Sequence, residues 1–115
     1  MHYKRSVQVS EVLKREISEI ITNSLQDPRI GFVTITEVTL SDDLRYAKVY
    51  LSILGSPESE KETLKGLKSA RGYIRKLIGE HLGLRYTPEI SFHLDRSITD
   101  GAHIDELLKE IRESE

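Results

Sequence analysis

FVTITEVTLSDDLRYAKVYLSI, which runs from Phe32 to Ile53, is the stretch of sequence that decides the fold. Its two ends are rich in β-branched and aromatic residues, which favour strands. The residues between them, Ser41, Asp42 and Asp43, are typical of turns. We therefore predict a β-hairpin with strands at residues 32–40 and 45–53.

The second predicted strand alternates cleanly between apolar and other side chains. One face carries Ala47, Val49, Leu51 and Ile53, and the opposite face carries Tyr46, Lys48, Tyr50 and Ser52. In the first strand the apolar set changes phase between Ile35 and Val38. Such a change indicates either a β-bulge or a strand covered on both faces, and the sequence leaves both open.

Helical spacing of apolar residues precedes and follows the hairpin. The first stripe contains Val9, Val12, Leu13, Ile17, Ile20, Ile21 and Leu25, and Pro28 with Gly31 marks the end of that helix. Ser56 and Pro57 are typical of a helix start, since serine can cap free N–H groups and proline is tolerated at the first helical position. The second stripe contains Leu64, Leu67, Ala70, Ile74, Leu77 and Ile78. Gly66, Gly72, Gly79 and Gly83 interrupt it, so we expect this helix to be bent or broken.

A third strand is expected after Pro88, with Ile90, Phe92 and Leu94 on one face and His93 on the other. Ser97 and Asp100 then resemble a capping pair for a last helix that carries Ile104, Leu107, Leu108 and Ile111. The predicted architecture is α+β, a two-layer sandwich of a three-stranded sheet with helices on one face. The long connection between the second and third strands favours a parallel pair.

The composition restricts the classes of function. A chain of 115 residues with 37% hydrophobic residues suits a single domain, which we assign to residues 1–115. No apolar run is long enough to cross a membrane, so we expect a cytoplasmic protein. The absence of cysteine excludes disulfides and thiolate chemistry, and the four histidines show no metal-ligand spacing. We therefore expect no cofactor, no metal and no enzymatic activity, and a cryptic hydrolase is the least favoured alternative.

The longest recognisable segment is DPRIGFVTITEV, from Asp27 to Val38, which continues through SDDL to AKVYLSI. The element order resembles a type II K-homology fold, with Ser69-Ala70-Arg71-Gly72 where that fold has a Gly-x-x-Gly loop. Together these segments resemble the ribosome-binding factor A family, in which a kink separates two helices at this point and a further helix follows the last strand. The resemblance implies a non-catalytic factor for 30S subunit assembly that binds 16S ribosomal RNA. It also implies a role in late rRNA processing and cold adaptation, as a monomer with one copy on each subunit.

Charge is unevenly distributed although the net charge is only −2. Bases dominate residues 65–85, and acids dominate the segment after Asp95. The predicted RNA-binding residues are Lys65, Lys68, Ala70, Arg71, Gly72, Arg75, Lys76 and Arg85. A glycine at a helix break would let an RNA backbone approach and would leave N–H groups free to bind phosphate. The alternative is that Gly72 permits close helix packing and that the bases are ordinary solvated residues.

Weaker candidates lie elsewhere in the sequence. Lys4, Arg5, Arg29 and Lys48 are expected as peripheral phosphate contacts, although Arg29 could equally fix its turn. The tyrosines that flank Lys48, with His93, could stack on RNA bases, but cross-strand packing is the commoner role for tyrosines on a sheet. A competing function is a protein-interaction adaptor that docks through the acidic face of the last helix.

Overall fold

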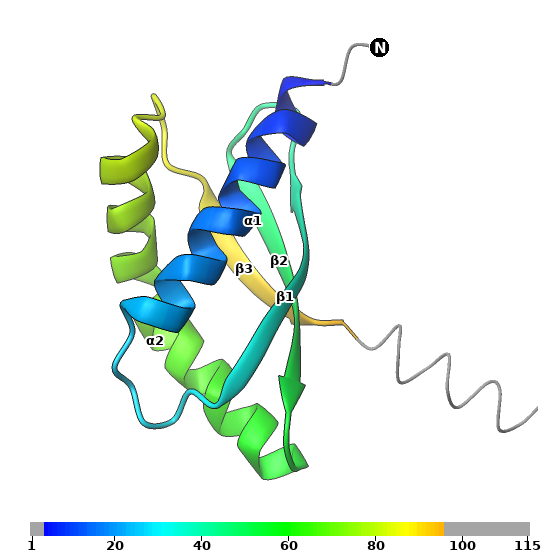
Figure 1. Ribbon diagram of the computed structural model, residues 1–115. Coiled ribbons are helices and arrows are strands. Elements are labelled where there is room, and N and C mark those ends of the chain that lie inside the picture. The colour runs from blue at the N-terminus through cyan, green and yellow to red at the C-terminus, as the bar shows by residue number, and fades with distance from the viewer. Residues whose placement is uncertain (1–3, 96–115) are drawn as a thin grey trace, which may run out of the picture.

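The computed structural model describes residues 4–95, which form two helices and three strands in the order α-β-β-α-β (Figure 1). Helix α1 is Arg5–Asn23 and helix α2 is Pro57–Leu82. The strands are β1, Phe32–Leu40, β2, Tyr46–Leu54, and β3, Glu89–Leu94. The predicted last helix lies outside the described residues.

The three strands form one sheet in the order β1-β2-β3. Strands β1 and β2 are antiparallel, with Val38 opposite Val49, and β2 and β3 are parallel, with Val49 opposite Phe92. The register between β1 and β2 shifts between Ile35 and Glu37, which leaves Thr36 as an extra residue. The hairpin and the parallel pair are therefore confirmed, and the phase change in β1 is a β-bulge.

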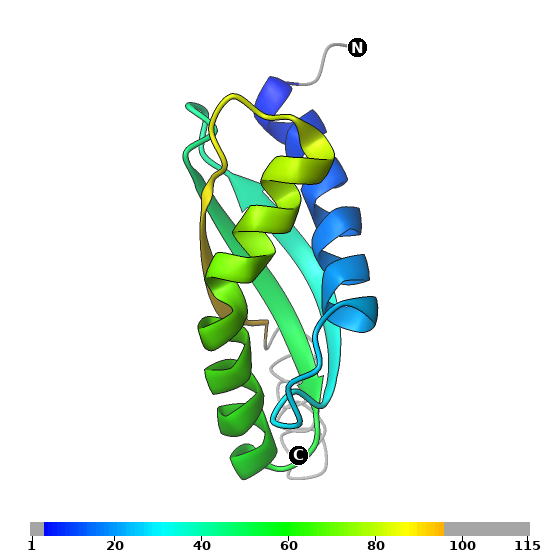
Figure 2. The ribbon, with the colours of Figure 1, turned by 90° about the vertical axis from the view of Figure 1, so that its left-hand side faces the viewer.

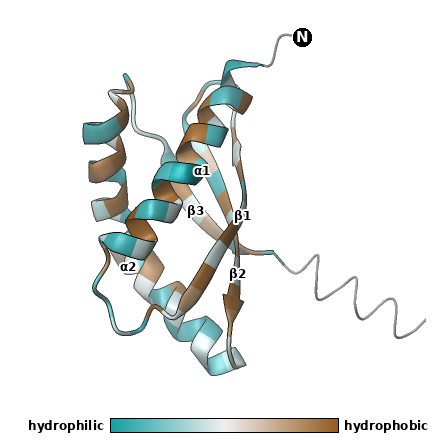
Figure 3. Ribbon diagram, in the orientation of Figure 1, coloured by the Kyte–Doolittle hydropathy of each residue, from teal (hydrophilic) through white to brown (hydrophobic). Residues whose placement is uncertain are grey.

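Both helices cover one face of the sheet, as two views of the ribbon show (Figures 1 and 2). The apolar residues of β2 that alternate with polar ones are all buried beneath them, and the helices contribute Leu13, Ile17, Leu67 and Ile74 to the same core. Apolar segments of the helices lie toward the sheet and polar segments lie outside (Figure 3). The predicted α+β two-layer fold is confirmed.

Helix α2 differs from the prediction in one respect. It is a single helix of 26 residues that continues through Gly66, Gly72 and Gly79, where the sequence suggested two helices. Its axis bends near its middle (Figure 2), so of the two predicted alternatives the bent helix is confirmed and the broken helix is wrong. A glycine keeps its backbone N–H and C=O, so it lowers helix stability without ending the helix. The helix ends at Gly83, whose φ of 60° places it in the left-handed region that suits glycine.

The start of α2 confirms the predicted cap. The Ser56 hydroxyl oxygen accepts a hydrogen bond from the Ser59 N–H at 3.2 Å, and Pro57 occupies the first turn. Helix α1 ends at Asn23, earlier than the predicted end at Pro28, and Val12 of its predicted apolar stripe is 36% exposed. The loop that follows α1 therefore includes the whole Asp27-Pro-Arg-Ile-Gly31 segment.

This loop is fastened to α2 by one buried side chain. Thr63 is fully buried, its hydroxyl donates to the Arg29 carbonyl oxygen at 3.2 Å, and its oxygen accepts from the Gly31 N–H at 3.2 Å. One turn further along α2, a Cβ on Gly66 would lie 2.7 Å from Cγ1 of Ile30. The loop therefore lies so close to α2 that a residue larger than glycine at position 66 would clash with Ile30.

Replacing Thr63 with valine keeps the side-chain shape but removes the hydroxyl. We expect the free energy of unfolding to fall by about 1–3 kcal/mol, because the Arg29 carbonyl and the Gly31 N–H lose their partner. Urea denaturation monitored by circular dichroism measures this change. The matched control is Thr39→Val on the exposed side of β1, which should change stability by less than about 0.5 kcal/mol. Equal effects of the two substitutions would contradict the role given to Thr63.

Candidate nucleic-acid interface

The outer side of α2 is a continuous basic surface. Residues 63–79 contain five lysines and arginines and no acidic residue. Leu67, Ile74 and Ile78 point into the core, so helical spacing places Lys65, Lys68, Gly72 and Lys76 on the opposite side, with Arg71 at its margin. All five of these residues are exposed to solvent. We call this surface, Lys65 to Lys76 on the outer side of α2, the basic face.

Three side chains of the basic face have no charged partner among residues 4–95. Among residues 4–95, no ion pair or side-chain hydrogen bond involves Lys68, Arg71 or Lys76. Lys65 differs, since its Nζ lies 3.4 Å from Oε1 of Glu62, one turn earlier in the helix. Unpaired cations on a rigid helix can bind an anionic partner without first breaking an internal ion pair.

Gly72 lies at the centre of the basic face. A Cβ built at this residue would meet no heavy atom of residues 4–95 within 4 Å, apart from its chain neighbours and the backbone of its own helix. Within that part of the chain the structure therefore contradicts the alternative that Gly72 permits close packing between helices. The expectation of free N–H groups at a helix break is also wrong, because α2 continues through this position. A glycine inside a helix costs about 0.5–1 kcal/mol relative to alanine, and no packing among residues 4–95 explains that cost.

Arg75 is the member of the predicted set with a clear internal role. Its Nε donates to the Pro88 carbonyl oxygen at 3.0 Å and its Nη2 to the Thr87 carbonyl oxygen at 3.1 Å. Its guanidinium also lies 3.4 Å from Oε1 of Glu89. Arg75 thus joins α2 to the segment that leads into β3, and its contribution to RNA binding stays a prediction. Ala70, also in the predicted set, is half-buried against the core.

The remaining predicted residues are spread around the protein. Arg85 lies beyond the end of α2 with its guanidinium carbon 5.4 Å from the centre of the Tyr86 ring. Lys4 and Arg5 are at the start of α1, where Lys4 Nζ is 3.8 Å from Asp42 Oδ1. Lys48 is exposed on the side of the sheet that faces away from α1 and α2. None of these four belongs to the basic face.

Arg29 is held by Asp27. Its Nη2 donates to Asp27 Oδ2 at 2.6 Å and its Nε to Asp27 Oδ1 at 3.0 Å. The hydrogen bond from this guanidinium lowers the pKa of Asp27 below its ordinary value of 3.8, and the same bond raises the pKa of Arg29. Arg29 therefore fixes its turn through the Asp27 carboxylate, and its contact with RNA phosphate stays a prediction.

The side of the sheet that faces away from α1 and α2 carries the aromatic residues considered for base stacking. Tyr50 and His93 are opposite each other in register, and their ring centres are 5.5 Å apart. Ser91 Oγ lies 2.8 Å from Nε2 of His93. Both rings are half-buried, so the contact is the cross-strand packing that the sequence favoured as the commoner role.

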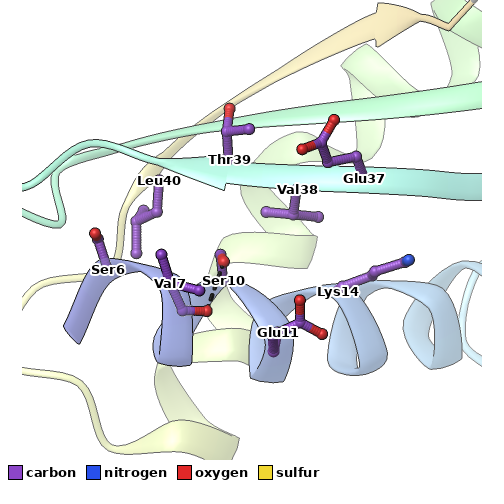
Figure 4. A pocket seen from close by; sticks show the side chains of 9 residues that line it. All are labelled: Ser6, Val7, Ser10, Glu11, Lys14, Glu37, Val38, Thr39 and Leu40. Carbon is purple, nitrogen blue, oxygen red and sulfur yellow. Dashed lines mark hydrogen bonds between the residues drawn. The ribbon is translucent and has the colours of Figure 1, made fainter. Parts of the chain in front are cut away.

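A groove lies away from the basic face, between α1 and β1 (Figure 4). Its volume is about 240 Å³, and Glu11, Lys14 and Glu37 give it mixed charge.

Within residues 4–95 no three acidic or histidine side chains are grouped to hold a metal ion. No helix in that part of the chain is long and apolar enough to span a membrane.

Two residues near the basic face were missed by the sequence prediction. Lys61 is exposed one turn before Lys65, and Tyr73 is 47% exposed beside Gly72. The spacing of Lys61, Lys65 and Lys68 by four and three residues was the available signal. The glutamates on either side of Lys61 obscured it, because a mixed run of charges resembles an ordinary solvated surface.

Comparison with known proteins identifies the family. The family model described as ribosome-binding factor A matches residues 5–108. A ribosome-binding factor A from Halothermothrix orenii is 51% identical over 115 residues, which are 100% of this chain and 94% of the relative. This chain belongs to the ribosome-binding factor A family.

Solved structures of ribosome-binding factor A have the same fold. The crystal structure of the Thermus thermophilus protein is similar with a TM-score of 0.72 and 26% identity, and the match covers 80% of this chain and 97% of that one. A homology model of the Thermus thermophilus factor, fitted into a cryo-electron microscopy map of its complex with the 30S subunit, has a TM-score of 0.63. It is 28% identical, and the match covers 76% of this chain and 91% of that one.

Alanine substitutions at Gly72 and Gly66 test how closely α2 is packed at these two residues. Gly72→Ala should raise the free energy of unfolding by about 0.5–1 kcal/mol, because the added methyl group meets no neighbour and alanine favours the helix. Gly66→Ala should lower it by up to about 2 kcal/mol, because the clash with Ile30 costs more than the gain in helix propensity. Urea denaturation of both variants measures the two changes. Loss of stability in Gly72→Ala would show that Gly72 is packed.

The Asp27–Arg29 pair predicts a specific sensitivity to acid. Since the folded state lowers the pKa of Asp27, the pair contributes stability above the ordinary value of 3.8 and loses it as the pH falls below that value. Asp27→Asn should therefore lose less free energy of unfolding than the wild type between pH 6 and acid pH. Urea denaturation at several pH values tests this expectation. The double variant with Arg29→Gln should match Asp27→Asn, and a further loss would mean that Arg29 acts through another group.

Proposed function

We propose that this chain binds 16S ribosomal RNA on the immature small ribosomal subunit through the basic face of α2. The single observation that carries the proposal is that Lys68, Arg71 and Lys76, around an open Gly72, have no ion-pair partner within residues 4–95. RNA suits such a surface, because several of its backbone phosphates can bind neighbouring cations at once.

The dimensions of α2 suit a phosphate backbone. The 11 residue steps from Lys65 to Lys76 span about 16 Å along the helix axis, at about 1.5 Å for each residue. The missing side chain at Gly72 lets the sugar-phosphate chain approach the helix between the flanking cations. Tyr73, exposed beside Gly72, adds a ring on which an unpaired base can stack.

The family supports a role in ribosome assembly. The Thermus thermophilus factor is the protein fitted into a map of a 30S complex, and the present chain shares its fold. On this basis the proposed function is maturation of the 30S subunit, including late processing of 16S RNA and growth in the cold. The protein would act without catalysis in the cytoplasm, as a monomeric domain with one copy on each subunit.

The competing adaptor function depends on the acidic face of the predicted last helix. That helix lies beyond residue 95, and no observation on residues 4–95 favours it as a docking site for another protein. The basic face therefore carries the proposal.

Substituting Lys68 and Arg71 with glutamine tests the basic face directly. Binding to purified 30S subunits should weaken by about tenfold or more for each phosphate contact removed, since a hydrogen bond to a charged group contributes about 1.5–3 kcal/mol. The slope of log K against log salt concentration should become shallower by about 1.4–1.8 for two lost phosphate contacts. Co-sedimentation over a salt series measures both quantities.

The matched control removes the same charge from elsewhere in the protein. Arg15→Gln with Arg45→Gln changes two exposed bases, one on α1 and one just before β2, and neither is among the predicted RNA-contact residues. This variant should keep at least most of the affinity and the salt slope. If the control weakens binding as much as the Lys68 and Arg71 variant does, RNA binding is not localised on α2, and the proposal is wrong.

A further inference from the structure

Three cavities follow the boundary between α1 and the outer edge of β1. Strand β1 lies at one edge of the sheet, and no other strand of residues 4–95 pairs with its outer side. The first cavity, about 240 Å³, lies between the first half of α1 and residues 37–40 (Figure 4). The second, about 170 Å³, lies beside residues 33–35, and the third, about 310 Å³, lies at the α1–β1 loop. We call these three cavities together the edge groove.

The backbone of β1 directs hydrogen-bonding groups toward this groove. Along an antiparallel strand the peptide groups alternate, so every second residue points its N–H and C=O away from the neighbouring strand. The Ser41 N–H donates to the Tyr46 carbonyl oxygen at 2.9 Å, so Ser41 is directed toward β2. Alternation then directs the backbone groups of Leu40 and Val38 outward.

The same holds beyond the β-bulge at Thr36. The Leu51 carbonyl oxygen is bonded on the β3 side, so its partner in β1, Ile35, also directs its backbone groups outward. Lysine, proline or a bulge usually protects an edge strand from pairing, and of these β1 has only the bulge. The edge is therefore able to accept a short additional strand.

The side chains around the groove differ on its two sides. On the helix side Val7 is 43% exposed, and Leu25 and Val33 are only partly buried. On the other side Glu37 points away from α1 (Figure 4). It is the only charged residue of β1, and no ion pair within residues 4–95 involves it.

A strand of another protein fits this combination better than RNA does. An added strand bonds to the outward backbone groups in a row, and its side chains point alternately to the two sides of the sheet. Its apolar side chains would then enter the groove. RNA phosphates would instead meet Glu11, Asp27 and Glu37. Lys14 is the only base that lines the three cavities.

We infer that the outer edge of β1 binds an extended segment of a protein partner as a fourth strand of the sheet. The segment has apolar residues on the helix side and a basic residue beside Glu37 on the other side. The bulge at Thr36 restricts the pairing to a short segment, so the side chains provide the specificity. Because this edge is separate from the basic face of α2, the protein can bind RNA and the partner together.

NMR spectroscopy with a peptide probe tests the inference. The probe is a synthetic seven-residue peptide with valine at the odd positions, threonine at the second and sixth, and arginine at the centre. In ¹⁵N-labelled full-length protein it should shift the amide signals of Ile35, Val38 and Leu40. At ten times its Kd it should slow their hydrogen exchange by about tenfold. The signals of Lys68 and Gly72 should not move, and because no RNA is present the result does not depend on RNA binding by α2.

A charge swap tests the position of the basic residue. Glu37→Lys should weaken binding of the arginine peptide by about fivefold, because like charges then lie beside each other. A second peptide with glutamate at its centre should bind the variant more tightly than it binds the wild type. The matched control, Glu58→Lys, makes the same change in the first turn of α2 and should keep the wild-type affinity for both peptides.

Several results would overturn the inference. The arginine peptide would shift no amide signal of β1, or the charge swap would leave the preference between the two peptides unchanged. A single-stranded oligouridine that shifts the same three amides would assign the edge to RNA. Shifts that depend on protein concentration without peptide would assign it to a second copy. Strong protection of these amides in the free protein would mean that the chain itself covers the edge.

Discussion

Burial of one face of β2 is the constraint on which the rest of the structure depends. Ala47, Val49, Leu51 and Ile53 alternate along the central strand, and all four are buried. Burying a large aliphatic side chain contributes about 1.5–3 kcal/mol, so this face must be covered. Strands β1 and β3 occupy both edges of β2, which leaves the cover to α1 and α2.

Because the helices cover one face of the sheet, their packing determines which side chains of α2 can bind a partner. Because α2 lies on the sheet through Leu67, Ile74 and Ile78, the residues between them by helical spacing must face solvent. On the side opposite the core these residues are Lys65, Lys68, Gly72 and Lys76. The net charge of −2 hides this surface, since acids elsewhere in the chain balance the bases of α2. A protein with no overall positive charge can therefore still present a binding surface for RNA.

Parts of this structure could be predicted from the sequence because they depend on local periodicity. The hairpin, the parallel third strand and the cap at Ser56 follow from alternation, turn residues and capping chemistry. The continuity of α2 could not be predicted, because glycine lowers helix propensity whether or not tertiary packing holds the helix together. At Gly66 the close approach of Ile30 explains the glycine, and at Gly72 no contact within residues 4–95 does.

The site was partly predictable for a similar reason. Helical spacing identified the exposed bases of α2, but it could not distinguish Lys68 from Arg75, since both fit the same pattern. Arg75 binds two carbonyl oxygens 12 and 13 residues away, and such a contact depends on how the chain folds back. The Thr63 bridge to the α1–β1 loop was missed on the same grounds, because its partners lie more than 30 residues away.

The most direct test of RNA binding by α2 is a cryo-electron microscopy structure of this protein on the immature small subunit. We predict that the side chains of Lys68, Arg71 and Lys76 lie within about 4 Å of RNA phosphate oxygens, the distance of an ion pair. We also predict that the sugar-phosphate chain passes over Gly72. A complex in which the outer side of α2 faces solvent and the sheet or α1 contacts the RNA would contradict this account.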